Sequence, residues 1–110
     1  MVKKQSQIKK TIKDLVDSLK RKGIKVNKLI LYGSYANGNP RPDSDIDVAV
    51  ISSSFNNKNI LKRQELLGEA IFGLSEPVEA IGYSYSEFSK RSRLSFLFDI
   101  VSSGKIVYQE

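Results

Sequence analysis

The chain contains no cysteine, no histidine and no tryptophan among its 110 residues. Without cysteine it can form neither a disulfide bond nor a thiolate metal site. Without histidine it can build no zinc-hydrolase centre, no Ser-His catalytic triad and no imidazole acid–base pair. Any catalysis must therefore use carboxylates, hydroxyls, lysines or a bound metal ion.

Long apolar runs are also missing. No segment is apolar enough to span a bilayer, and the lysine-rich N-terminus lacks the apolar core of a signal peptide. We therefore expect a cytoplasmic protein. The length predicts one domain covering residues 1–110, because single cores usually serve about 100–200 residues.

The net charge of +6 is unevenly distributed. Residues 1–28 hold ten Lys/Arg and two Asp, a charge of +8, which leaves −2 for residues 29–110. The basic segment is either a surface that attracts a nucleotide, an RNA or an acidic protein, or the solvated face of an amphipathic helix.

The hydrophobic pattern alternates between helical and extended periods, which predicts a single α/β or α+β domain with a small mixed sheet of about four strands flanked by helices. The expected strands are 28–32, 45–51, 77–83 and 105–108. The expected helices are one with the stripe Ile8, Ile12, Leu15, Val16 and Leu19, one over 60–74 with Ile60, Leu67 and Ile71 on one face, and a C-terminal region with Ser86 as a cap and the stripe Leu94, Leu97, Phe98 and Val101.

Gly33-Ser34 follows the first expected strand and opens what could be a helical turn. Gly33 has no Cβ, so an anion can approach its backbone closely, and the N–H groups at a helix start carry partial positive charge. Ser34 adds a hydroxyl donor. These features suit a phosphate, although an ordinary strand-to-helix turn with a serine cap would look the same.

Asp45 and Asp47 begin the second expected strand, on one face and roughly 6.6 Å apart along the chain. Two like charges at neighbouring positions repel each other, and aspartate is a poor strand former. A hard cation would offset that repulsion, and magnesium takes one or two carboxylates together with phosphates. A solvated strand entrance, with Asp43 and Asp45 as turn residues, is the alternative.

The run Gly33-Ser34-Tyr35-Ala36-Asn37-Gly38, followed by Ser44-Asp45-Ile46-Asp47, resembles the signature of the DNA polymerase β-type nucleotidyltransferase superfamily. It is most similar to the minimal nucleotidyltransferases (MNT proteins) of MNT/HEPN toxin–antitoxin modules. Pro77-Val78-Glu79-Ala80-Ile81 stands where that family has its third acidic strand, so the resemblance covers nearly the whole chain.

The resemblance implies a role for each matching residue. Gly33 and Ser34 would hold the triphosphate of ATP, while Asp45, Asp47 and Glu79 would be the catalytic carboxylates and would ligate Mg²⁺, with two ions expected. The implied reaction transfers AMP to a hydroxyl of a helical HEPN-type partner protein, which makes the chain the antitoxin of a toxin.

Two other functions stay open at this point. Glu79 stands where many active relatives carry aspartate, so the chain could instead be a binding module that neutralises its partner by contact, with a weak or inactive site. The third interpretation is an RNA-binding domain that uses the basic N-terminal helix, although the interleaved aromatic or Gly-rich features of RNA modules are missing.

Overall fold

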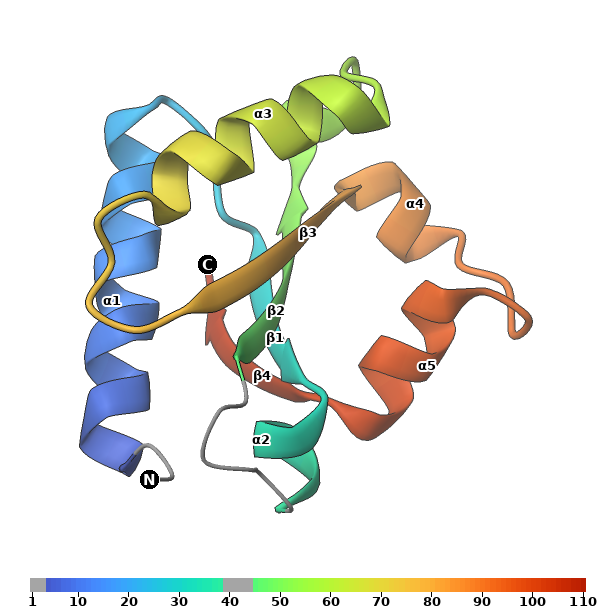
Figure 1. Cartoon of the computed structure of the whole chain (residues 1–110). Coiled ribbons are helices and arrows are strands. Elements are labelled where there is room, and N and C mark those ends of the chain that lie inside the picture. Colours follow the sequence, from blue (N-terminus) through green and yellow to red (C-terminus); the bar gives the residue numbers. More distant parts are fainter. Residues whose placement is uncertain (1–3, 39–44) are drawn as a thin grey trace.

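The structure is a computed structural model that describes residues 4–38 and 45–110 (Figure 1). Helices and strands alternate along the chain, as the sequence predicts. In order they are α1 (Gln5–Arg21), β1 (Lys28–Tyr32), α2 (Ser34–Asn37), β2 (Ile46–Ser52), the short 3₁₀ helix η1 (Ser53–Phe55), α3 (Ile60–Ile71), β3 (Val78–Ser84), α4 (Tyr85–Ser89), α5 (Phe96–Ser103) and β4 (Lys105–Gln109).

All four strands form one mixed sheet in the order β3-β2-β1-β4. β1 lies antiparallel to both β2 and β4, whereas β2 and β3 run parallel. A parallel pair needs a crossover connection, and α3 provides it. The prediction of a small mixed sheet of about four strands flanked by helices is confirmed.

The sheet separates two apolar clusters because side chains alternate between its faces. α1 and α3 cover one face, where Leu29, Leu31 and Val48 join the larger cluster. α4 and α5 lie on the other face, where the smaller cluster has five buried members: Ile30, Ala49, Ile51, Leu97 and Ile100. The side chains of the odd-numbered residues of β2, including Asp47, therefore point toward the face of the sheet that carries α5.

Helix α1 follows the predicted stripe closely. All five of its predicted apolar residues are buried: Ile8, Ile12, Leu15, Val16 and Leu19. The lysines of α1 lie on its outer surface. Gly23 stops the helix with a φ of +76°, a conformation that glycine adopts without strain. Within residues 4–38 and 45–110, no helix is long and apolar enough to cross a membrane.

Three sequence-based expectations about helices are wrong in detail. The cap of α4 is Ser84, not Ser86: its hydroxyl accepts from the Glu87 N–H at 3.0 Å, and Glu87 accepts from the Ser84 N–H at 2.7 Å. Leu94 is 97% exposed because Ser95 caps α5 and the helix begins only at Phe96. Ile60 is 73% exposed because it is the first residue of α3 and lies outside its packed face.

A buried arginine ties α3 to the elements around it. Arg63 donates to the carbonyls of Lys58, Phe55 and Gly82, and its Nη1 lies 2.6 Å from the Glu87 Oε1. These bonds satisfy a charged group that would otherwise be very costly to bury. They fix α3 against η1, β3 and α4, on the edge of the sheet that carries Glu79.

Candidate active site

The two halves of the sequence motif meet at Gly33. This residue follows β1 with φ +74° and ψ −152°, a region that is essentially open only to glycine. A Cβ added at this position would overlap the Oδ2 of Asp47 on the neighbouring strand β2. The candidate phosphate-binding segment therefore directly adjoins a candidate metal-binding carboxylate.

Ser34 begins α2 immediately after Gly33, and α2 is a single helical turn. The Ala36 N–H donates to the Gly33 carbonyl at 3.1 Å and closes this turn. Ser34 is half-buried at the same end of the sheet. The intervening part of the motif, residues 39–44, lies outside the described residues, as does the side chain of Asn37.

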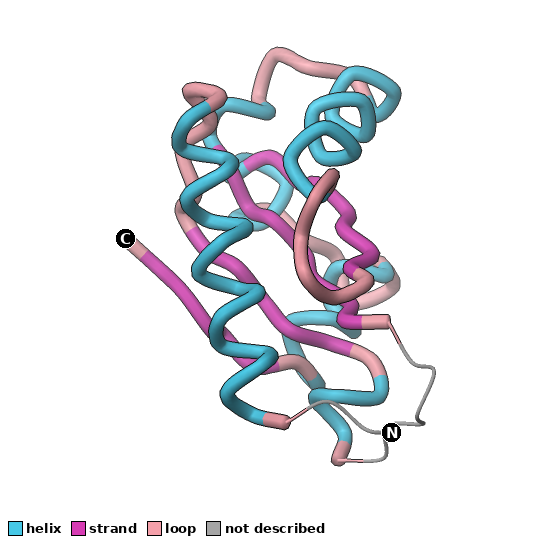
Figure 2. Tube along the Cα trace, turned by 60° about the vertical axis from the view of Figure 1, so that its left-hand side comes forward, coloured by secondary structure: helices cyan, strands magenta, loops and turns pink. Residues whose placement is uncertain are grey.

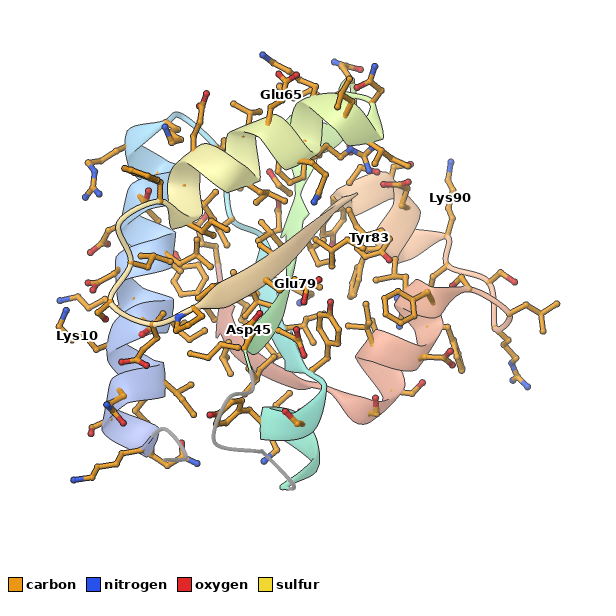
Figure 3. All side chains as sticks on the ribbon, in the orientation of Figure 1. Lys10, Asp45, Glu65, Glu79, Tyr83 and Lys90 are labelled. Atoms are coloured by element: carbon orange, nitrogen blue, oxygen red, sulfur yellow. The ribbon has the colours of Figure 1, made fainter. Side chains whose placement is uncertain are left out.

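Asp47 and Glu79 lie side by side on the sheet. They are register partners on the parallel strands β2 and β3, so both side chains project from the α5 face. Asp47 is half-buried and Glu79 is exposed, and Asp45 stands just before β2 with its side chain in solvent. Figure 3 labels Asp45 and Glu79, which come from adjoining segments at the middle of the molecule.

The electrostatics of this group are unfavourable without a cation. The pKa of Asp47 is raised, first by its burial and then by the negative charges of Glu79 and Asp45. A raised pKa means that the surroundings of the carboxylate disfavour its negatively charged form. Such a cluster is typical of a site that binds a positive ligand.

Tyr32 also belongs to the site, and the sequence analysis did not assign it. It is the antiparallel partner of Asp47, and its ring lies edge-on to Phe96 with centroids 6.0 Å apart. Burial raises the pKa of its hydroxyl to about 12, with further contributions from Asp47, Glu79 and Tyr83. In the sequence, its position just before Gly33 was the only indication that Tyr32 belongs to the site. Only the register of β1 with β2 shows that it lies beside Asp47.

The donor atoms suit magnesium held jointly with a phosphate ligand. They are all carboxylate and hydroxyl oxygens, which hard cations prefer. In the part of the chain that the structure describes, no three acidic side chains come close enough to hold a metal ion by themselves. Magnesium commonly takes only one or two protein carboxylates and completes its shell with water and substrate phosphates, so Asp47 with a neighbouring carboxylate fits that pattern.

The carboxylates of the site differ in exposure: Asp45 and Glu79 are exposed, whereas Asp47 is half-buried. A groove of about 830 Å³ lies on the opposite face of the sheet, between α1 and β4. None of the five predicted site residues lines it: Gly33, Ser34, Asp45, Asp47 and Glu79. The groove is therefore distinct from the candidate active site.

Known proteins resemble this chain in sequence and in fold. A Methanocaldococcus jannaschii protein, MJ0604, named as a candidate protein adenylyltransferase, is 30% identical over 90% of this chain and 96% of its own length. The structure of a nucleotidyltransferase candidate from Sulfolobus solfataricus matches with a TM-score of 0.61 at 20% identity, over 100% of this chain and 93% of that one.

Two solved toxin–antitoxin structures share the fold. One contains AMP-PNP and matches with a TM-score of 0.60 at 24% identity, over 93% of this chain and 73% of that one. The other, a mutant of MntA-HpeT, matches with a TM-score of 0.59 at 23% identity, over 90% and 72%. The nucleotidyltransferase domain family matches residues 12–107, which include every site residue described above. This match covers most of the chain, and the motif residues Gly33 and Asp47 adjoin each other in the structure. The chain therefore belongs to the nucleotidyltransferase domain family.

Proposed function

We propose that this chain transfers AMP from ATP to a hydroxyl of a partner protein in a magnesium-dependent reaction. The contact of Gly33 with the Asp47 carboxylate carries this proposal, because it brings a triphosphate-binding turn and a metal-binding group to one place. Glu79, in register with Asp47, extends the carboxylate row toward solvent, where an acceptor can arrive. We also propose that residues 1–110 form one domain and that the protein is cytoplasmic.

Each residue then has a definite task. Gly33 and Ser34 bind the β- and γ-phosphates through backbone N–H groups and the serine hydroxyl. Asp45, Asp47 and Glu79 would hold Mg²⁺ jointly with the substrate phosphates. When bound, magnesium supplies positive charge that stabilises the attacking and leaving oxygens. This preorganised charge provides most of the rate enhancement.

The acceptor oxygen attacks the α-phosphorus in line, its new P–O bond forms, and the bond to pyrophosphate breaks. The proton of the acceptor hydroxyl passes to the exposed Glu79 carboxylate and from there to water. Tyr32 stays neutral through the physiological range because the pKa of its hydroxyl is raised to about 12. It can therefore donate a hydrogen bond at this site and does not act as the base.

The relatives support ATP as the donor and a protein as the acceptor. The Methanocaldococcus relative is named as a candidate protein adenylyltransferase, and one toxin–antitoxin neighbour was solved with an ATP analogue. We therefore propose that the acceptor is a helical HEPN-type toxin and that this chain is its antitoxin.

A binding module remains the second candidate function. It is favoured by one observation: within residues 4–38 and 45–110, no three carboxylates form a ready-made metal site. In that case the chain would neutralise its partner by contact and would need no ATP.

Transfer of label from ATP distinguishes the two functions. The chain is produced together with the protein encoded beside it and is incubated with Mg²⁺ and ATP labelled on either the α- or the γ-phosphate. We expect the α-label, and not the γ-label, to appear on the partner. The rate should fall by at least about 100-fold in Asp45→Asn, Asp47→Asn and Glu79→Gln.

Glu65→Gln is the matched control, because Glu65 is an exposed carboxylate on α3 that lies away from Asp45 and Glu79 (Figure 3) and does not line the groove. If the two proteins form a tight complex and neither takes up label, the chain is a binding module and not an enzyme. Transfer of the γ-label would indicate a kinase, and undiminished transfer by the Asp47 variant would refute the assigned residue roles.

A further inference from the structure

The groove between α1 and β4 has no role in the proposed reaction, since it lies on the sheet face opposite Asp47 and Glu79. Along α1 it runs from Gln5 to Lys20, which corresponds to about 22 Å or four helical turns. Its other residues come from β1, from α2 and the glycine that follows it, and from β4: Leu31, Tyr35, Gly38, Lys105, Val107 and Tyr108. It is therefore a straight trough beside a helix, with a volume of about 830 Å³.

The floor of the trough is apolar, and most of its aliphatic side chains are buried: Ile8, Ile12, Val16 and Leu31 are each at most 7% exposed. β4 is the outer strand of the sheet, and all its residues are exposed or half-buried. Val107, at 37% exposure, continues the apolar surface of Leu31 and Val16. Figure 2 shows the C-terminal end of β4 emerging beside α1 with no helix over it. Val107 and the edge strand β4 are therefore the part of this floor that a partner can cover.

The walls of the trough are cationic. Four lysines and one aspartate line it, a net charge of +3: Lys9, Lys13, Lys20, Lys105 and Asp17. Lys20 is engaged by Glu110 at 3.4 Å and by the ring of Tyr108. Lys9, Lys13 and Lys105 form no ion pair with any carboxylate of the described residues. Those charges are available to an acidic ligand, and they repel a second copy of this basic chain.

We propose that the groove seats an acidic amphipathic helix of a partner protein. A helix laid parallel to α1 would place its apolar face on Leu31, Val16 and Val107. At the usual helix spacing of about 8–10 Å, its acidic flank would face Lys9 and Lys13. Most of the floor is aliphatic, and its two tyrosines, Tyr35 and Tyr108, are half-buried. This favours a peptide over single-stranded RNA, whose bases stack on exposed aromatic rings.

This docking mode goes beyond the proposed transfer and does not depend on it. Because the groove and the carboxylates lie on opposite faces of the sheet, a partner bound in the groove leaves the nucleotide site open. Binding and catalysis should therefore be separable by mutation.

The test uses a synthetic helical peptide with leucines on one face, glutamates on the flanks and one tryptophan, together with a twin that has lysines in place of the glutamates. The chain has no tryptophan, so the fluorescence of the peptide reports its own burial. We expect the acidic peptide to bind and the lysine twin not to bind. The double variant Lys9→Glu/Lys13→Glu should weaken binding of the acidic peptide by about tenfold or more.

Lys10→Glu/Lys90→Glu is the control with the same change in charge, since both lysines are exposed and neither lines the groove (Figure 3). Location is checked by single cysteines in this cysteine-free chain. The peptide should protect Val107→Cys from alkylation and leave the exposed Ser102→Cys reactive. Val107→Asp should also abolish binding if the apolar floor matters.

Three results would overturn the inference: no binding of the acidic peptide, equal binding to both double variants, or an oligouridine that binds the groove more tightly than the peptide. The last would make the groove a nucleic-acid site. Asp47→Asn should bind the peptide as well as the unmodified chain does. If the unmodified chain binds the peptide but transfers no AMP, the result counts against the proposed function only. If it transfers AMP but does not bind the peptide, the result counts against the groove only.

Discussion

Replacing Asp47 with asparagine should stabilise the fold while abolishing transfer. The substitution preserves size and removes one negative charge from the cluster with Glu79 and Asp45. Neighbouring strands lie about 4.8 Å apart, and two charges at that distance repel by about 1–2 kcal/mol at an effective dielectric constant of about 40–80. For a chain of this length the melting temperature should rise by roughly 4–8 °C in the absence of metal.

The effect should depend on pH in a defined direction. The pKa of Asp47 is raised in the folded state by burial and by Glu79 and Asp45. As pH falls from neutral, the native state therefore takes up this proton before the unfolded state does, and the unmodified chain gains stability. The advantage of the asparagine variant should be largest near neutral pH and should shrink as pH falls toward the ordinary aspartate pKa of about 4.

Thermal melts with a chelator, and then with Mg²⁺ and ATP, measure both effects. The unmodified chain should be stabilised by the ligands, and the variant should not, because ligand binding stabilises only the state that binds. Glu65→Gln should change neither result. A variant that melts below the unmodified chain without metal, or an advantage that persists on acidification, would refute the electrostatic account of this site.

Further predictions concern backbone and packing. Gly33→Ala should destabilise the chain by more than Gly23→Ala as measured by urea denaturation: both glycines have positive φ, but only at Gly33 would the new Cβ overlap the Asp47 carboxylate. The strained backbone alone should cost about 1–3 kcal/mol, and equal losses would argue against that overlap. Arg63→Met should destabilise by about 3 kcal/mol, because three carbonyls and Glu87 lose their buried donor; an unchanged urea midpoint would contradict this. Burial alone would raise the pKa of Glu87, but hydrogen bonds from the Ser84 backbone and from Arg63 lower it overall. Its contribution to stability is therefore complete above a pH of about 4.3 and is lost as pH falls through the lowered pKa, so Glu87→Gln should flatten this part of the acid-unfolding curve.

The amino-acid sequence by itself determined the local features of this protein. The spacing of Ile8, Ile12 and Leu15 predicts α1, and the apolar run 28–32 coincides with β1. Because the chain has no cysteine and no histidine, it offers oxygen atoms as the ligands for a metal ion. Period-two alternation separates the Asp47 side from the Val48 side of β2. Each of these follows from residues close together in the chain, where periodicity and residue type are sufficient.

Tertiary structure decided what depends on pairing between distant segments. The register of β2 with β3 places Glu79 beside Asp47, and the register of β1 with β2 places Tyr32 there. The contact of Gly33 with Asp47 and the uncovered trough beside α1 likewise arise only when the strands are ordered in the sheet. A one-residue slip in register would turn any of these side chains to the opposite face, so local sequence names the candidate residues while strand pairing makes them a site.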